Sequence, residues 1–431
     1  MPDASAATKP LAGVRVVEIS SFVAVPLAGM TLSQLGCEVI RVDPVDGAAD
    51  YHRWPLAAGG ASIYWAGLNK GKRSVAVDMR RPEGQQLVQR LVTESGPNGG
   101  ILITNVVGRN WQAYESLSAQ RPDLIHLEVS GRADGSTGVD YTVNAGVGFP
   151  QVTGHPTESR PVNHVLPAWD VACGLYAALG ITAALRHREM SGEGSRIRLP
   201  LEDVALATAG NLSFLTEPMI NGTQRRRLGN AIYGQYGHDF VSGDGVAFMI
   251  VALTGRHLRD LASVTGTTAA IATLSESLGA DFEDEGDRFR HREALTELFA
   301  GWFRQHTASA ISEALGETSV LWERYRTFAE AAADPLVTAN PMFSRLAQPD
   351  VGEYLAPGLP LSIDGTHAPA VPSPTLGDDT ADILEGRLGM TPDEVRVLRE
   401  SGLVATNHDH QRRILDTSPN VETSTTGGRR T

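Results

Sequence analysis

The alternation of apolar strand patterns with helix-like segments is what most constrains the fold of this chain. VRVVEI (14–19) is typical of a buried strand, the segment after it has Pro26 near its start and Gly36 at its end, and EVIRVD (38–43) follows as a second strand. Proline suits the first turn of a helix and glycine its C-terminal cap, so a strand, a helix and a parallel strand are predicted here. The cycle continues to about residue 130 and predicts an α/β fold with four or five mostly parallel strands.

The pattern changes after the arginines at 225–227. FVSGDGVAFMIVAL predicts a hairpin with a Gly-Asp-Gly turn, and helical segments and an acidic stretch, DFEDEGDRFR (281–290), follow it. We therefore expect a large domain that contains the parallel sheet and a smaller α+β domain inserted into it. The expected boundaries are 10–224 and 319–405 for the two parts of the large domain, 225–318 for the small domain and 406–431 for a polar tail.

Composition and charge limit the kinds of partner. Asp and Glu number 50 against 37 for Lys and Arg, a formal charge of -13, and this balance disfavours non-specific binding of nucleic acid or anionic lipid. No uninterrupted apolar run approaches the roughly eighteen residues of a membrane span, and the first residues contain no apolar leader-like stretch. Cys37 and Cys173 lie far apart, which argues against a disulfide framework or a structural zinc site. We expect a cytoplasmic protein without membrane or nucleic-acid partners.

Familiar cofactor and hydrolase motifs are missing from the sequence. It lacks the glycine triplet of dinucleotide-binding loops, the GxxxxGK[ST] loop, HExxH and GxSxG. The acidic stretch at 281–290 resembles a calcium loop in part, but Arg292 stands where the bidentate glutamate belongs, so a solvated acidic loop is predicted. We expect neither a metal nor a permanently bound cofactor.

A short basic segment, NKGKRS (69–74), is a candidate phosphate-binding site. Lys70, Lys72 and Arg73 would supply charge-assisted donors beside a predicted strand. Basic clusters of this length are also common in solvated loops, so that alternative stays open.

Asp170 is the candidate catalytic carboxylate. It ends the segment NHVLPAWD, directly before a long apolar helix predicted over about 170–190. Free backbone N–H groups and the helix dipole would stabilise its anion there, which favours a nucleophile over an acid, although a simple N-cap is the commoner role for such an aspartate. His164 could bind a substrate carboxylate or cap a turn, and Cys173 is predicted to belong to the core.

Several long segments are similar to those of a known family. They are PLAGVRVVEI, SQLGCEVIRVDP, NKGKRSVAVDM and WDVACGLYAALGITAAL. Together they resemble the class III CoA-transferases, the family of formyl-CoA transferase and acyl-CoA racemase, over about residues 10–405. The resemblance implies a Rossmann-like large domain built from both ends of the chain, a small inserted domain and two interlinked subunits. It also implies an acyl-CoA substrate, with CoA present only as part of that substrate.

The resemblance also assigns roles to residues. Asp170 matches the nucleophile of the family. Together with the basic segment, the resemblance gives three further groups of candidates. They are Val23, Ala24, Lys70, Lys72, Arg73, Arg80 and Asn105 for CoA, Arg109 in place of a family arginine without a clear match, and Arg53, Asp140 and His164 for the acyl group.

The expected reaction is a CoA transfer through Asp170. Segments such as FVAVPLAGMTLSQLG, DYHRWP and EDEGDRFR resemble members that move CoA from one carboxyl group of mesaconate to the other, so the resemblance implies an intramolecular transfer through an aspartyl-CoA thioester. An intermolecular transfer from an acyl-CoA donor to a dicarboxylic acid is the alternative. A racemase is less favoured, because Val139 stands where racemases of this family have a histidine base. A non-catalytic acyl-CoA sensor stays open.

Overall fold

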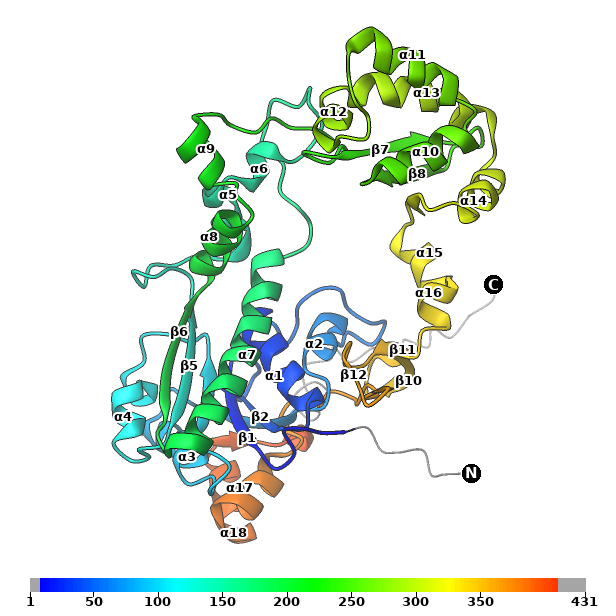
Figure 1. Cartoon of the computed structure of the whole chain (residues 1–431). Coiled ribbons are helices and arrows are strands. Elements are labelled where there is room, and N and C mark those ends of the chain that lie inside the picture. The colour runs from blue at the N-terminus through cyan, green and yellow to red at the C-terminus, as the bar shows by residue number, and fades with distance from the viewer. Residues whose placement is uncertain (1–7, 410–431) are drawn as a thin grey trace, which may run out of the picture. The chain divides into compact units, whose positions relative to one another are not determined.

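The computed structural model describes residues 8–409 and divides into two compact units (Figure 1). Most of the predicted polar tail, 406–431, lies outside the described residues. The first unit consists of the residues up to Val143, Pro167–Thr208 and the residues from Ala339 onward, and the second consists of Asn144–Leu166 and Ala209–Thr338.

A seven-stranded sheet forms the centre of the first unit in the described part of the chain. Its strand order is β14-β3-β2-β1-β4-β5-β6, and neighbouring strands are parallel except β14, which is antiparallel to β3. The inner strands are buried along most of their length, which explains their continuous apolar runs and confirms the predicted α/β fold. The strands are Arg15–Ile19 (β1), Glu38–Asp43 (β2), Arg73–Val77 (β3), Ile101–Thr104 (β4), Ile125–Ser130 (β5), Ser195–Pro200 (β6) and Val404–Ala405 (β14).

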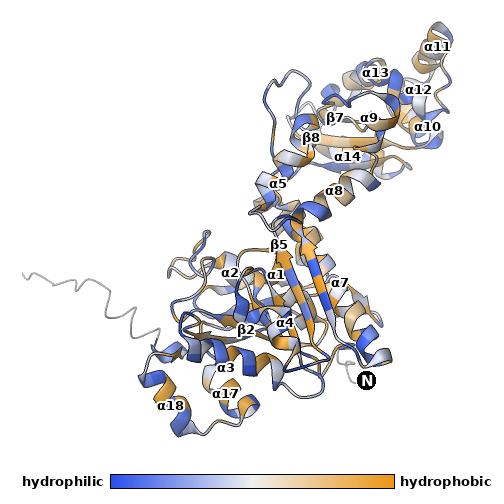
Figure 2. Ribbon diagram, turned by 90° about the vertical axis from the view of Figure 1, so that its left-hand side faces the viewer, coloured by the Kyte–Doolittle hydropathy of each residue, from blue (hydrophilic) through white to orange (hydrophobic). Residues whose placement is uncertain are grey.

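Three amphipathic helices, α3 (Pro82–Thr93), α17 (Thr380–Leu388) and α18 (Pro392–Glu400), form one layer of the first unit. Their buried side chains share a core with those of β1, β2 and β3. Hydrophilic and hydrophobic residues alternate along α3 and α18 in Figure 2, as expected for helices with one buried face. Each fully buried Leu, Ile or Val of this core contributes roughly 1.5–3 kcal/mol to stability.

The predicted long helix is present as α7, Ala168–Ser191. It ends at Gly192, whose φ of +77° suits glycine and whose N–H donates to the carbonyl oxygen of Arg188 (2.8 Å). It packs along α1 (Ala24–Gln34) so closely that a Cβ on Gly174 would lie 2.7 Å from the carbonyl oxygen of Ala24. Within residues 8–409, α7 alone is long and apolar enough to cross a membrane by length and composition. Its contacts with α1 and β5 are those of a core helix.

The second unit is built on a small antiparallel sheet. The predicted hairpin is confirmed, because β7 pairs with β8 in antiparallel register across the Gly-Asp-Gly turn, and β9 adds a third strand. Phe299 and Phe303 of α13 and Phe248 of β8 are fully buried in its core. The elements are Tyr236–Val241 (β7), Ala247–Ala252 (β8), Leu321–Arg324 (β9), Gly255–Val264 (α10), Thr268–Leu278 (α11), Glu285–Arg290 (α12), Arg292–Gln305 (α13) and Ala308–Gly316 (α14).

The acidic stretch at 281–290 differs from the predicted solvated loop. Residues from Glu285 form α12, and the side chain of Asp284 accepts a hydrogen bond from the N–H of Asp287 as its N-cap. Arg288 is buried and donates to the carbonyl oxygens of Phe282 and Glu283, so the guanidinium of an arginine, in place of a calcium ion, organises this segment. No cluster that could hold a metal ion occurs in the described residues.

The division between the units differs from the sequence-based boundaries at 225 and 318. β9 completes the small sheet, which extends the second unit beyond 318. The segment Asn144–Leu166 joins the same unit, since Arg227 donates to the carbonyl oxygen of Gln151 (2.9 Å). Such pairings between distant segments leave no local signal in a sequence.

Candidate active site

Asp170 is the third residue of α7 and lies in its first turn. The N-cap position belongs to Pro167, which supplies no side-chain hydrogen bond. The interpretation of Asp170 as a simple N-cap is therefore wrong. Its half-buried carboxylate remains available for chemistry at the end of the helix.

Asp140, from a distant part of the sequence, takes over the capping role. Its Oδ2 accepts hydrogen bonds from the backbone N–H groups of Trp169 (2.7 Å) and Asp170 (3.1 Å). The residue is 3 % exposed. These two bonds place Asp140 at the start of α7, beside Asp170. Its Oδ1 is buried without a hydrogen-bond partner in the part of the chain that the structure describes, and its predicted contact with the acyl group stays a prediction.

Burial and the neighbouring carboxylate of Asp140 raise the pKa of Asp170 to about 6, while the positive charge of Arg53 opposes this shift. The prediction that free N–H groups would stabilise the Asp170 anion is wrong, since Asp140 occupies those groups. A carboxylate with a raised pKa is a stronger nucleophile than an ordinary aspartate, and it is still mostly ionised above pH 7. The environment of Asp170 thus favours nucleophilic attack.

Arg53 is the cation whose positive charge acts on the carboxylate of Asp170. Its guanidinium lies over the rings of Phe22 (5.4 Å to the centroid) and Tyr64 (4.9 Å), and the side chain is exposed. Among the described residues no carboxylate forms an ion pair with Arg53. Burial raises the pKa of Tyr64 to about 12, so this ring stays a neutral phenol beside Arg53. A held guanidinium without an acidic partner suits a substrate carboxylate.

The loop after β1 is fixed by Asn105. Its side-chain amide donates to the carbonyl oxygen of Ser21 (2.8 Å), and its Oδ1 accepts from the N–H of the same residue (3.1 Å). Val23 and Ala24, which follow in this loop and α1, are 8 % and 4 % exposed. Little of their side chains can touch CoA, and the predicted contact of these three residues with CoA stays a prediction.

The basic segment behaves differently from both interpretations offered for it. Lys72 is buried and its Nζ pairs with Glu18 (2.8 Å), and burial lowers the pKa of this lysine to about 8. The prediction that Lys72 binds a phosphate is therefore wrong, because its ammonium group is buried and forms an ion pair with Glu18 in the core. Lys70 is also buried, and its Nζ donates to the carbonyl oxygen of Gly67 (2.9 Å). Neither lysine belongs to a solvated loop.

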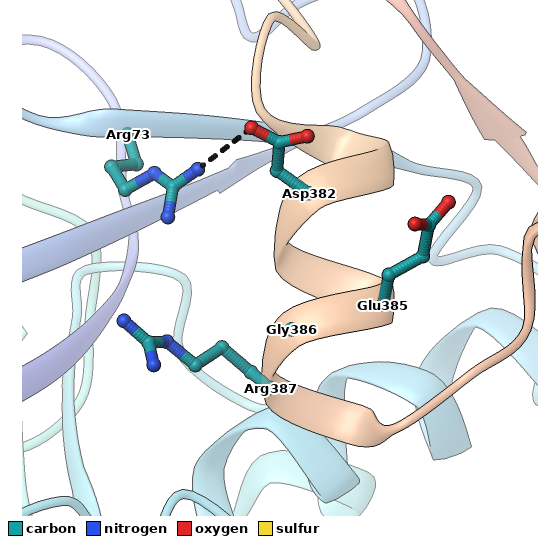
Figure 3. A pocket seen from close by; sticks show the side chains of 5 residues that line it. All are labelled: Arg73, Asp382, Glu385, Gly386 and Arg387. Carbon is teal, nitrogen blue, oxygen red and sulfur yellow. Dashed lines mark ion pairs between the residues drawn. The ribbon is translucent and has the colours of Figure 1, made fainter.

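Arg73 lies at the amino end of β3, whereas the loops that position Asp170 and Arg53 follow the carboxyl ends of other strands. It pairs with Asp379 (2.8 Å) and Glu38 (3.4 Å). A hollow of about 520 Å³ opens beside it, lined by Arg73, Asp382, Glu385, Gly386 and Arg387 (Figure 3). Both arginines of this hollow are paired with acids, and the predicted contact of Arg73 with CoA stays a prediction.

The other predicted residues are spread over the chain. Arg80 is exposed and pairs with Asp78 (2.8 Å), and Arg109 is exposed before a short 3₁₀ helix, Asn110–Gln112, so their contacts with CoA stay predictions. His164 belongs to the second unit, where its Nδ1 is hydrogen bonded with the carbonyl oxygen of Leu166, and its role stays a prediction as well.

Cys173 is confirmed as a core residue, and Cys37 is buried as well. Cys37 and Cys173 are buried and free, and burial raises the pKa of each thiol to about 12. Neither thiol is activated for nucleophilic attack, which leaves Asp170 as the candidate nucleophile of this site.

Comparisons with known proteins place the chain in a family. A family model described as CoA-transferase family III matches residues 11–380. The chain is 46% identical over 399 residues to 2-methylfumaryl-CoA isomerase of Chloroflexus aurantiacus, covering 92% of this chain and 98% of the relative. It is 29% identical over 420 residues to succinyl-CoA–D-citramalate CoA-transferase of the same organism, covering 92% and 98%. A solved CAIB/BAIF family protein from Brucella suis superposes with a TM-score of 0.72 and 26% identity, covering 88% of this chain and 99% of that one.

Proposed function

Since the chain belongs to CoA-transferase family III, we propose that it is an enzyme that moves CoA within one substrate and converts 2-methylfumaryl-CoA to 3-methylfumaryl-CoA. The observation that supports this most directly is the half-buried Asp170 at the start of α7, with its raised pKa and with the charge of Arg53 acting on it. The relative with 46% identity over nearly the whole chain has this isomerase activity in its name.

The proposed reaction begins when Asp170 attacks the thioester carbonyl of 2-methylfumaryl-CoA. The C–S bond breaks, CoA leaves as a thiolate and a mixed anhydride joins Asp170 to the acyl group. The thiolate then attacks the aspartyl carbonyl, which forms an aspartyl-CoA thioester and releases mesaconate as a carboxylate. The other carboxylate of mesaconate attacks this thioester, a second anhydride forms, and the thiolate attacks its mesaconyl carbonyl. The product is 3-methylfumaryl-CoA, and Asp170 is regenerated as a carboxylate.

Arg53 is the proposed partner of the free carboxylate of the substrate. A guanidinium binds a carboxylate through two parallel N–H donors, and Arg53 is held over two rings without an acid of its own. Retention of mesaconate between the two halves of the reaction is what separates an isomerase from an ordinary transferase, and this contact supplies part of it. His164 remains a second candidate for the same task.

The alternative is an intermolecular CoA transfer from a donor such as succinyl-CoA to a dicarboxylic acid. It is supported by the 29% identity to relatives named succinyl-CoA–D-citramalate CoA-transferase and succinate–glutarate CoA-transferase. The racemase is the weakest reading, because Val139 supplies no base ahead of Asp140.

Incubation of the enzyme with 2-methylfumaryl-CoA and labelled free mesaconate tests the proposal. If mesaconate stays bound between steps, 3-methylfumaryl-CoA forms with little label in either ester. A parallel reaction with succinyl-CoA and labelled mesaconate serves as the control. Rapid labelling of the esters in both reactions would favour the intermolecular transferase, and the absence of any CoA transfer would reject both readings.

We propose that two copies of the chain associate through α7. Leu175, Tyr176 and Leu179 of this helix are each more than half exposed, although α7 is otherwise a core helix. Apolar side chains gathered on one helix are unfavourable in water and are commonly covered by a partner. Light scattering should give a mass of about twice the 46.0 kDa of one chain, and a mass of one chain would contradict the proposal. An interlinked arrangement of the two subunits is the form that the resemblance implies.

Two further proposals concern the setting of the reaction. The enzyme needs no permanently bound cofactor, since CoA arrives with the substrate and Asp170 holds it between steps. The cytoplasm is the proposed location, because its reducing conditions suit two free, buried cysteines.

A further inference from the structure

A group of buried charged side chains joins the strands of the large sheet to the loop before α1. Arg41 of β2 is 0 % exposed and pairs with Asp43 (Nε to Oδ2, 3.0 Å) and Asp50 (Nη2 to Oδ1, 3.1 Å). Lys72 and Glu18 lie in the same group, with Glu18 Oε1 3.8 Å from a guanidinium nitrogen of Arg41. Desolvation offsets most of the attraction in buried ion pairs, so such a group is weak evidence for stability. The contacts that this group makes with the loop before α1 are more informative about its role.

Asp50 is the member of this group that reaches the loop. While its Oδ1 pairs with Arg41, its Oδ2 accepts a hydrogen bond from the N–H of Phe22 (3.1 Å). Phe22 has a φ of +65°, a left-handed conformation that a phenylalanine keeps only where its surroundings hold it. Arg41 also donates to the carbonyl oxygen of Ser20 (3.2 Å). The backbone before α1 is thus fixed from the sheet.

Asp50 also holds the turn that contains Arg53. The carbonyl oxygen of Asp50 accepts a hydrogen bond from the N–H of Arg53 (3.1 Å), and the guanidinium of Arg53 then lies over the ring of Phe22. Ser62 donates from its hydroxyl to the carbonyl oxygen of Arg53 (2.5 Å) and completes the support. The carbonyl bond to Arg53 is a main-chain contact that any residue at this position would make. The carboxylate of Asp50 acts on Arg53 through Phe22, one of the two rings beneath the guanidinium.

We propose that Asp50 is a positioning residue: anchored on Arg41, it holds Phe22 and Arg53 where the charge of Arg53 acts on Asp170 and on the free carboxylate of the substrate. The part that concerns substrate rests on the function proposed above. Asp50 does not touch substrate itself, and its effect on the reaction passes through Arg53. The sequence offered no sign of this role, because Arg41 and Asp50 belong to different elements and Asp50 looks like an ordinary loop aspartate.

The pKa of Asp170, followed by carbon NMR of labelled aspartate, tests the proposal without turnover. The groups that act on this carboxylate are Asp140, which raises its pKa, and Arg53, which lowers it. In Asp50→Asn a negative charge is lost, which by itself would lower the pKa of Asp170 or leave it unchanged. If Arg53 shifts away, the pKa instead rises, and we expect an increase of about half a unit. An unchanged or lowered pKa would overturn the proposal.

Asp43→Asn is the matched control. It removes the same charge from the other side of Arg41, yet its carboxylate bonds to Arg41 and not to Phe22 or Arg53. We expect Asp43→Asn to lose stability as Asp50→Asn does and to leave the pKa of Asp170 in place. Equal shifts in both variants would mean that loss of the buried charge, and not the position of Arg53, is responsible, which rejects the proposal.

A double-mutant cycle adds a kinetic readout. We expect Asp50→Asn to lower kcat/KM about 10- to 100-fold, mostly through KM, and to have less than about a 3-fold effect in an Arg53→Gln background. Additive effects would show that Asp50 does not act through Arg53. If Asp50→Asn does not fold, Asp50→Glu keeps a carboxylate for Arg41 while its longer side chain displaces Phe22, and the same results are expected. If the wild type shows no isomerisation, the proposed function fails while the NMR titration still decides this inference.

Discussion

Replacement of Asp170 by asparagine should abolish turnover and, at the same time, make the protein more stable. The carboxylate is the proposed covalent carrier of CoA, and an amide cannot form the anhydride or the thioester, so we expect kcat/KM to fall by about 10³-fold or more. Asp170→Ala should lose as much activity, which excludes a contribution from asparagine that has reverted to aspartate by deamidation. Activity within about 10-fold of the wild type in both variants would remove Asp170 as the nucleophile.

The gain in stability follows from the sign of the pKa shift. The pKa of Asp170 is about 6 in the folded protein and 3.8 in the unfolded chain, so the ionised carboxylate present above pH 6 destabilises the folded state relative to the unfolded state. Because the group is only half buried, removal of the charge should stabilise the protein at pH 7.5 by on the order of 1–3 kcal/mol, seen as a rise of a few degrees in Tm. The difference between wild type and variant should shrink as pH falls through 6 and vanish below about 4.

A matched control is Asp393→Asn, which changes an exposed aspartate in the first turn of α18. It should leave both activity and Tm nearly unchanged, since no burial acts on that carboxylate. Mass spectrometry of wild-type enzyme quenched with borohydride during turnover should locate the reduced residue at Asp170. Equal Tm values for wild type and Asp170→Asn at pH 7.5 would contradict the raised pKa, even if activity is lost.

The parallel sheet could be predicted because its causes are local. Strands buried on both faces need continuous apolar runs, and Pro26, Gly36 and Pro82 mark helix ends wherever they lie in a chain. The limits of the second unit could not be predicted in this way. These limits depend on the pairing of β9 with β8, which lies about 70 residues earlier, and the sequence of β9 does not indicate which strand it pairs with.

The site shows the same limit on a finer scale. Asp170 was identified as the candidate, but its electrostatics were predicted with the wrong sign, because the helix N–H groups that were expected to stabilise it are bonded to Asp140, thirty residues earlier. Lys72 was taken for a surface cation although Glu18, fifty-four residues away, pairs with it in the core. In both cases the charge of the residue was taken into account, but the distant residue that interacts with it could not be identified from the sequence. Charge–charge pairing across a sheet has no period or spacing that a sequence reveals.

The pH at which activity is lost on the acid side of the pH–rate profile should move in opposite directions in two variants with substitutions beside Asp170. The wild type should lose activity as pH falls through about 6, because only the carboxylate form of Asp170 attacks. Arg53→Gln removes the positive charge that lowers this pKa, so the acid limb of the profile should move to higher pH. It should also weaken the grip on the free carboxylate of the substrate and lower kcat/KM by about 10²-fold.

Asp140→Asn supplies the opposite case. Its amide oxygen still accepts the N–H groups at the start of α7, but the negative charge that raises the pKa of Asp170 is gone, so the limb should move to lower pH. Arg53→Lys separates charge from geometry, because it keeps the limb near that of the wild type while it loses the two-point contact with the substrate. Rates measured from pH 4.5 to 9 on the three variants and the wild type decide the matter. Limbs that move together, or not at all, would show that a group other than Asp170 controls the reaction.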